Sequence, residues 1–302
     1  MTLQESWSKT ITKTIKLAKN AGFCYGVKRA VDTTKKIKQE NPSKSVSVLG
    51  ELIHNSHVTN ELECLGIETL NSLPEAGEGI CIIRSHGESD STFEEIKSKG
   101  YEIVDLTCLD VKKVQQKAVE MVLDGYFVII LGKYDHPEVS AIYTNAKNKA
   151  NDINNVFVAQ NIDAIKAIKD KIKLASKVGI VLQTTQTKEF LIEVINYLST
   201  ICKVLKVQNT ICPSTTLRQE EAKKLGLESD LMVVVGSKKS ANTTHLAQIL
   251  DGITKTIHIE HQNELKNYKN EIINAKNIGV TAGASTPDSI INAVMTELEN
   301  IN

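Results

Sequence analysis

Three of the six cysteines in this 302-residue chain stand in the same local context, a turn between an apolar strand pattern and a helical pattern. Cys24 lies between Gly22 and Gly26, and glycine lets the backbone pass close to a bound group because it carries no side chain. Cys108 follows after 84 residues (24 to 108) and Cys212 after a further 104 (108 to 212). Repeats of this size predict three similar domains around a pseudo-threefold axis, which would bring the three thiols to one central point.

Cysteine is also a common buried residue, so the alternative is that these three are unrelated core residues. We interpret the remaining Cys64, Cys81 and Cys202 in that way, because they lie near a helix end, inside a strand pattern and in a helix-to-strand link. The first 14 residues are polar and lack the apolar core of a secretory signal. We therefore expect a cytoplasmic protein whose cysteines are ligands, nucleophiles or core residues rather than disulfides.

Polar side chains follow the predicted strands, at the strand ends where open parallel sheets bind ligands. His54, His86 and His136 each come after such a strand. Hydroxyl and amide side chains hold the same position after other strands, namely Thr184, Ser240, Asn242 and Ser285. Helices start after these strands, and the free N–H groups at a helix start can bind an anion such as a diphosphate. The alternative is that the hydroxyl residues are N-caps and the histidines are structural.

Glu138 is the acid best placed for proton transfer, because it comes two residues after His136. Its alternative role is that of a first-turn helix acid that interacts with the helix dipole. The chain contains no Gly-x4-Gly-Lys-Ser/Thr loop, and no Gly-x-Gly-x-x-Gly follows a strand. Binding of ATP, NAD or FAD in the manner of those motifs is therefore not supported.

The elements that must position these residues alternate short β-branched runs with helical patterns. Near-continuous apolar runs are typical of parallel strands covered on both faces, so we predict an α/β fold. The predicted strands are Val46–Leu49, Ile80–Ile83, Glu102–Leu106, Phe127–Leu131, Val156–Ala159, Val178–Leu182, Val204–Val207, Leu231–Val235, Lys255–Ile259 and Ile278–Thr281. We expect three domains, at 15–107 with Cys24, 108–208 opening with Cys108, and 209–302 with Cys212.

The composition excludes several classes of partner. Lysine plus arginine and aspartate plus glutamate both count 36, so the formal charge is zero and attracts neither nucleic acid nor an anionic membrane. Aromatic residues make up only 4%, too few for a base-stacking surface. No run approaches the roughly 18 apolar residues that span a bilayer. We expect a monomer with no nucleic-acid or membrane partner.

Taken together, these motifs resemble the 4-hydroxy-3-methylbut-2-enyl diphosphate reductase family, also called LytB/IspH. The resemblance covers about residues 15–295. The stretches that carry it are Gly22-Phe23-Cys24-Tyr25-Gly26-Val27, Ile53-His54-Asn55, Arg84-Ser85-His86-Gly87, Thr107-Cys108, His136-Pro137-Glu138-Val139, Gln183-Thr184-Thr185, Ile211-Cys212 with Thr215 and Arg218-Gln219, Gly236-Ser237-Lys238 with Ser240 and Asn242, and Thr281-Ala282-Gly283-Ala284-Ser285.

The resemblance implies three small α/β domains around a central 4Fe-4S cluster. Cys24, Cys108 and Cys212 match the family's cluster ligands. Three thiolates on a four-iron cluster leave one iron without a protein ligand, free to act as a Lewis acid. The implied reaction is a reductive dehydroxylation that uses two electrons and two protons and gives isopentenyl and dimethylallyl diphosphate. Ferredoxin or flavodoxin would supply the electrons.

The resemblance also implies roles for the other site residues. Glu138 matches the proton-delivering acid, Thr184 its hydrogen-bonding partner, and Thr215 a position near the substrate's oxygen. The positions that match diphosphate contacts are His54, His86, His136, Ser240, Asn242 and Ser285. Ala241 departs from the serine common in the family and offers at most its backbone N–H. We expect diphosphate binding to survive through its neighbours.

Two alternatives keep the cysteines but change the function. A non-catalytic cluster-binding redox sensor would need neither Glu138 nor Thr184 nor three histidines aimed at a diphosphate, so these residues favour the enzyme. A structural zinc site of three cysteines and one histidine is the other alternative. Zinc sites usually have two ligands close together in sequence, and spacings of 84 (24 to 108) and 104 (108 to 212) do not suit them.

Overall fold

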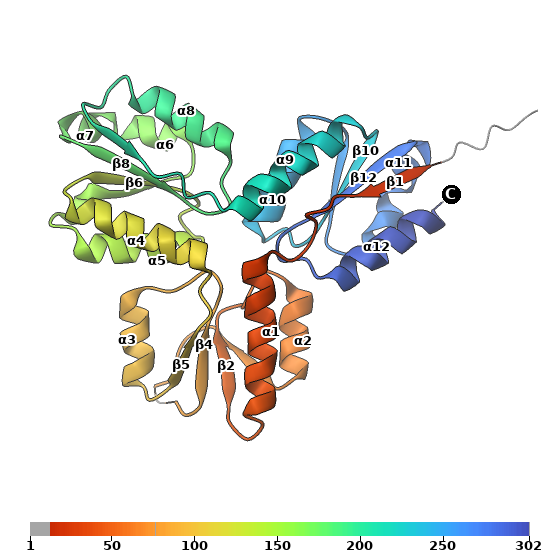
Figure 1. Cartoon of the computed structure of the whole chain (residues 1–302), viewed down its shortest axis with the longest axis horizontal. Coiled ribbons are helices and arrows are strands. Elements are labelled where there is room, and N and C mark those ends of the chain that lie inside the picture. Colours follow the sequence, from red (N-terminus) through yellow and green to blue (C-terminus); the bar gives the residue numbers. More distant parts are fainter. Residues whose placement is uncertain (1–12, 76, 302) are drawn as a thin grey trace, which may run out of the picture.

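The computed structural model describes residues 13–75 and 77–301. Its strands form three four-stranded sheets, and every strand pairing in these two ranges is parallel. Each sheet with its helices forms one lobe, and the three lobes surround a common centre (Figure 1). The α/β class and the three small α/β units predicted from the sequence are confirmed.

The first lobe contains the sheet β3-β2-β4-β5. Its central strand β4 is buried at every position, as its continuous apolar run predicts, while β3 exposes its middle residues at the sheet edge. This mixed burial explains why β3 is absent from the predicted strands. The elements are α1 (Tyr25–Glu40), β2 (Val46–Leu49), α2 (Ser56–Cys64), β3 (Ile67–Leu70), β4 (Ile80–Ile83), α3 (Asp90–Ser98) and β5 (Glu102–Asp105).

The second lobe contains the sheet β7-β6-β8-β9, and its core lies on both faces of β6. Val128 and Ile130 pack with α4 and α5, whereas Ile129 and Leu131 pack toward α6, α7 and α8. The elements are α4 (Leu109–Leu123), β6 (Phe127–Leu131), α5 (Pro137–Lys149), a short 3-10 turn (Ile153–Asn155), β7 (Val156–Ala159), α6 (Ile162–Ala167), α7 (Lys169–Leu174), β8 (Val178–Leu182), α8 (Lys188–Leu198) and β9 (Leu205–Val207).

The third lobe contains the sheet β1-β12-β10-β11, so it is built from both ends of the chain. The elements are β1 (Thr14–Leu17), α9 (Pro213–Leu227), β10 (Leu231–Val235), α10 (Ala241–Asp251), β11 (Thr256–Ile259), a 3-10 segment (Gln262–Tyr268), α11 (Lys269–Asn274), β12 (Asn277–Ala282) and α12 (Asp288–Asn300).

The course of β1 differs from the expected domain limits. The range 15–107 assigns the residues before Cys24 to the first domain, but β1 pairs with β12, with Thr14 opposite Asn277 and Leu17 opposite Val280. Backbone pairing thus places these residues in the third sheet, and the chain enters the first lobe only at α1 (Figure 1). The other domain limits stay a prediction.

Among the described residues, no helix combines the length and the apolar character that crossing a bilayer would need.

Candidate active site

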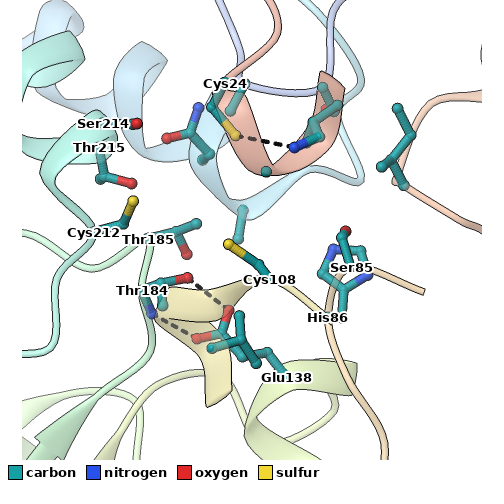
Figure 2. Close-up of a pocket in the computed structure, with 18 of the residues that line it drawn as sticks. Cys24, Ser85, His86, Cys108, Glu138, Thr184, Thr185, Cys212, Ser214 and Thr215 are labelled. Atoms are coloured by element: carbon teal, nitrogen blue, oxygen red, sulfur yellow. Dashed lines mark hydrogen bonds between the residues drawn. The ribbon is translucent and has the colours of Figure 1, made fainter. Parts of the chain in front are cut away.

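A cavity of about 100 Å³ lies where the three lobes meet. All thirteen predicted site residues line it, and Figure 2 shows ten of the lining residues by label. They are Cys24, His54, His86, Cys108, His136, Glu138, Thr184, Cys212, Thr215, Ser240, Ala241, Asn242 and Ser285. The fold therefore brings together every position singled out from the sequence, while the role of each stays a prediction.

Each of the three cysteines is the N-cap of a helix in a different lobe. Cys24 precedes α1, Cys108 precedes α4 and Cys212 precedes α9. Their thiols lie around one side of the cavity (Figure 2). Helix N-termini offer unpaired N–H groups and the positive end of the helix dipole, which stabilise a thiolate. The thiol of Cys24 already accepts a hydrogen bond from the N–H of Val27 at 3.5 Å.

The surroundings of the thiols fit a bound iron–sulfur group. Gly26 leaves space beside them, because a Cβ at this position would lie 2.8 Å from the Cys108 Sγ and 4.0 Å from the Cys24 Sγ. Cysteine thiolates are the usual ligands of such clusters. Burial first, and then the neighbouring Asp110, raises the pKa of Cys212 to about 12. A bound cation would favour ionisation of the Cys212 thiol, and a metal group supplies one.

A single metal ion suits the three cysteines less well. Within the described ranges, the group of histidine, cysteine or acidic side chains that lies close enough to hold one ion consists of His54, His86 and His136, and the cysteines form no such group. Ligands of a multi-metal cluster bind different atoms of the cluster and can stand further apart. This spacing favours a cluster over the structural zinc alternative.

Glu138, in the first turn of α5, is a buried acid held by two hydrogen bonds from Thr184. The Thr184 N–H donates to Oε1 at 2.7 Å and the Thr184 hydroxyl donates to Oε2 at 2.9 Å (Figure 2). Burial raises the pKa of Glu138 to about 7, although both hydrogen bonds act to lower it. A carboxyl group with this pKa can hold and release a proton near neutral pH, as a general acid must.

The three histidines form a compact cluster at the other side of the cavity. Ring centroids lie 4.5 Å apart for His54 and His86, 5.4 Å for His54 and His136, and 5.3 Å for His86 and His136. The N–H of Glu138 donates to Nδ1 of His136 at 3.2 Å, so the ring proton of a neutral His136 must lie on Nε2. That nitrogen is then a hydrogen-bond donor, which suits an anion better than a metal ion.

Burial favours the neutral form of His136 and His86 when no anion is bound. It lowers the pKa of His136 to about 3, and the neighbouring His54 and Arg84 act in the same direction. Burial also lowers the pKa of His86 well below its ordinary value, again with His54 as the next cause. The Nδ1 of His86 is buried and has no hydrogen-bond partner among the described residues. An anion in the cavity would reverse these effects, because it favours the charged imidazolium.

The third lobe adds further hydrogen-bonding groups to the cavity. Asn242 is buried, and neither of its side-chain polar atoms has a hydrogen-bond partner in the part of the chain that the structure describes. Ser240 is the N-cap of α10 without a side-chain capping bond, which leaves its hydroxyl available. Ser285 instead donates to the His54 carbonyl at 3.4 Å, and Asn55 donates to the Ser285 carbonyl at 2.8 Å. These two bonds join the first and third lobes at the cavity.

Three lining residues were missed as site residues in the sequence. The buried hydroxyl of Thr185 has no hydrogen-bond partner in the described ranges, and Thr185 stands next to Thr184, so its motif could have indicated it. Asp110 accepts hydrogen bonds from the thiol of Cys212 at 3.0 Å and from the hydroxyl of Tyr25 at 2.6 Å. Arg218 is buried at 3% exposure. Arg218 stands in one of the stretches that carry the family resemblance, whereas nothing in the local sequence reveals Asp110, because its contacts with Cys212 and Tyr25 join different lobes.

Comparison with known proteins places this geometry in a family. The sequence model described as LytB protein matches residues 15–299. A protein of Campylobacter hominis is 39% identical over 95% of this chain and 99% of its own length, and one of Aquifex aeolicus is 39% identical over 94% and 96%. A Clostridium tetani relative is 40% identical over 95% of this chain, which spans only 44% of that protein. All three are named 4-hydroxy-3-methylbut-2-enyl diphosphate reductase.

Solved structures agree with the sequence relatives. A structure of (E)-4-hydroxy-3-methyl-but-2-enyl diphosphate reductase, the terminal enzyme of the non-mevalonate pathway, matches with a TM-score of 0.68 and 37% identity over 95% of this chain and 99% of its own. The E-1-hydroxy-2-methyl-but-2-enyl-4-diphosphate reductase of Plasmodium falciparum matches with a TM-score of 0.84 and 25% identity, over 94% and 87%. With nearly its whole length matched by the family's sequence model, this chain belongs to the LytB protein family.

Proposed function

We propose that the central cavity reduces 4-hydroxy-3-methylbut-2-enyl diphosphate to isopentenyl and dimethylallyl diphosphate, with loss of the hydroxyl group as water. The observation that carries the proposal is that three N-cap cysteines, one buried acid and a cluster of anion-binding groups all line the same cavity. The names of the relatives and the solved structures give the substrate.

Cys24, Cys108 and Cys212 would hold a 4Fe-4S cluster at the meeting point of α1, α4 and α9. When bound, such a cluster supplies electrons and an iron without a protein ligand that polarises the substrate's hydroxyl oxygen. The donor set fits this group, since thiolates are its usual ligands and Gly26 keeps the space beside two of them open.

Glu138 holds the proton that the departing hydroxyl group needs. Its pKa of about 7 keeps a large fraction protonated at neutral pH. Thr184 fixes both carboxyl oxygens, and its hydroxyl, 2.9 Å from Oε2, is placed to pass a proton onward. The diphosphate lies at the other side of the cavity, where the histidine cluster, Ser240, Asn242 and Ser285 donate to its oxygens together with the backbone N–H of Ala241.

The reaction also needs a source of electrons, for which we propose ferredoxin or flavodoxin, because the sequence contains no motif for a flavin or nicotinamide of its own. We propose a cytoplasmic monomer. A single chain contributes every residue of the cavity described above, so the site needs no partner copy.

Anaerobic reconstitution tests the proposal. The wild-type chain should bind about four irons with matching sulfide, show a visible spectrum that the allylic diphosphate perturbs, and form both products with a chemical reductant. Cys24→Ser, Cys108→Ser and Cys212→Ser should each lose iron, whereas Cys64→Ser, at an exposed position, should not. A colourless protein, or a cluster whose spectrum the diphosphate leaves unchanged, would overturn the reductase in favour of a structural or sensing role.

A further inference from the structure

Arg218 carries a buried guanidinium group beside the cysteines. It lies on α9, lines the cavity and is only 3% exposed. Its Nη2 donates to the carbonyl of Gly22 at 2.7 Å and its Nη1 donates to the carbonyl of Ser214 at 3.4 Å. Its buried Nε has no hydrogen-bond partner in residues 13–75 and 77–301. Both partners are neutral carbonyls, so the hydrogen bonds do not balance the charge.

A carboxylate partner is also missing in the part of the chain that the structure describes, since no acid there lies within 4.0 Å of this guanidinium. Glu221, one turn further along α9, acts on it only at longer range. The oxygens of Glu221 accept instead from the backbone N–H groups of Lys19 and Asn20, at 2.6 and 2.8 Å. A buried cation without a counter-charge is strongly destabilising, so a site of this kind calls for an anion.

Within the described residues, the groups that supply this anion are the thiols of Cys24 and Cys212. Burial lowers the pKa of Arg218, and the two groups that oppose this effect most are Cys24 and then Cys212, ahead of Glu221. Both cysteines line the same cavity as Arg218, and Arg218 stands six residues (212 to 218) beyond Cys212 on the helix that Cys212 caps. Once ionised, these thiolates face the arginine through a region of low dielectric, where charges interact strongly.

We propose that Arg218 is the counter-charge of the cluster site and sets its reduction potential. This role rests on the proposed function in one respect only, that the three cysteines hold an iron–sulfur cluster. Adding an electron makes the group on the thiolates more negative, and a fixed positive charge nearby favours that state. Net charge and hydrogen bonding around a cluster are among the factors that set its potential. Arg218 is also a positioning residue for Cys24, because it holds the Gly22 carbonyl two residues before that ligand.

The test compares the midpoint potential of the reconstituted cluster in three variants by anaerobic spectroelectrochemical titration. Arg218→Gln removes the charge but keeps an N–H donor. It should shift the potential to a more negative value, and a tenfold weaker preference for the reduced state corresponds to about 59 mV for one electron. Arg218→Lys keeps the charge and should stay near the wild type.

Arg29→Gln is the matched control. Arg29 is exposed and donates to the carbonyls of Leu106 and Thr107, at 3.3 and 2.7 Å, just before Cys108, so it has a comparable backbone role in a solvated place. Water screens its charge, and the potential of this variant should not change.

Several outcomes would overturn the proposal. One is a wild-type potential in Arg218→Gln, and another is an equal shift in Arg218→Lys and Arg218→Gln. If Arg218→Gln retains no iron, Arg218→Lys decides: a full iron content with a near-wild-type potential supports the charge, and iron loss in both variants makes the residue purely structural. A wild-type chain that binds no cluster at all contradicts the proposed function itself, and is thereby told apart from a failure of the arginine's role.

Discussion

Thr184 satisfies both carboxyl oxygens of Glu138, one through its backbone N–H at 2.7 Å and the other through its hydroxyl at 2.9 Å. The acid comes from α5 in the second lobe, and the threonine follows β8 in the same lobe. Both bonds favour the carboxylate, yet burial outweighs them and raises the pKa to about 7. The pair is thus balanced so that the proton is held loosely near neutral pH.

Glu138→Gln should fold and bind the cluster but lose turnover. The amide oxygen can still accept from the Thr184 N–H, while the transferable proton is gone. Removal of a general acid typically costs 10²–10⁴-fold in rate, so we expect a loss of at least about 100-fold. In the wild type, activity should fall as the pH rises above about 7, because the acid then loses its proton. Near-full turnover of the variant would falsify the assignment of Glu138.

Thr184→Val should move the pH dependence of the rate. It removes the hydroxyl bond to Oε2, which stabilises the carboxylate, and keeps the backbone bond to Oε1. The pKa of Glu138 then rises further, and the alkaline limb of the rate profile shifts to higher pH. Thr184→Ser retains the hydroxyl and is the control. An unchanged limb in the valine variant, measured by single-turnover rates across pH, contradicts this coupling.

Folding stability should fall as the pH drops below about 6.5, in part because of His136. The pKa of His136 is about 3 in the folded protein. Between pH values of about 3 and 6.5, His136 therefore binds a proton only in the unfolded chain, and the free energy of unfolding falls by about 1.4 kcal/mol for each pH unit of acidification. Glu138, whose folded pKa of about 7 lies above its ordinary value, acts in the opposite sense between about 4.5 and 7.

Urea unfolding at several pH values checks both signs in the same metal-free protein. His136→Asn should flatten the loss of stability on the acid side, and Glu138→Gln should steepen it. A slope that stays the same in both variants contradicts the assigned titrations.

Gly26→Ala should impair cluster binding without unfolding the chain. The added Cβ would lie 2.8 Å from the Cys108 Sγ, closer than real Cβ contacts allow, so a ligand must move. Gly252→Ala, at the end of α10, is the matched control because its nearest contact, the Ile249 carbonyl, is 3.7 Å away. Iron per chain after reconstitution is the measurement. Equal iron in the two variants contradicts the tight fit at Gly26.

Ala241→Ser should tighten diphosphate binding by about tenfold, because it adds a hydroxyl donor at the first position of α10, which lines the cavity. Ala247→Ser lies on the same helix but outside the cavity and should leave affinity unchanged. Calorimetry with the diphosphate substrate compares the two. A wild-type affinity in Ala241→Ser means that the neighbours already satisfy the diphosphate oxygens.

The strands and the site residues differ in how far the sequence predicts them. Central strands such as β6 and β10 are fully buried and continuously apolar, so their pattern is sufficient. Site residues that follow these strands are predictable as well, because parallel strands align their carboxyl ends. Edge strands are harder. β1 exposes most of its residues, and no local feature tells which sheet it will join.

Helix α9 shows a second limit of prediction. Its buried positions include Thr215, Arg218 and Gln219. A polar buried stripe of this kind cannot be recognised from hydrophobic periodicity, which assumes that buried faces are apolar. Likewise, the bond from the thiol of Cys212 to Asp110 joins two lobes and has no signature in either segment. Pairing across lobes depends on tertiary structure alone.

The pairing of β1 with β12 also sets an order of events during synthesis. β1 leaves the ribosome early and β12 late, so the third sheet cannot gain its fourth strand until nearly the whole chain has emerged. The first and second sheets use strands that are complete by Val207 and can form before then. Cys24 is the N-cap of α1 and can be placed with the first lobe, whereas Cys212 caps α9, which follows Val207, so the three thiols come together only after the third lobe has folded. The cavity that all three thiols line is therefore completed late, and an unfinished chain exposes the thiols of Cys24 and Cys108 before that cavity exists.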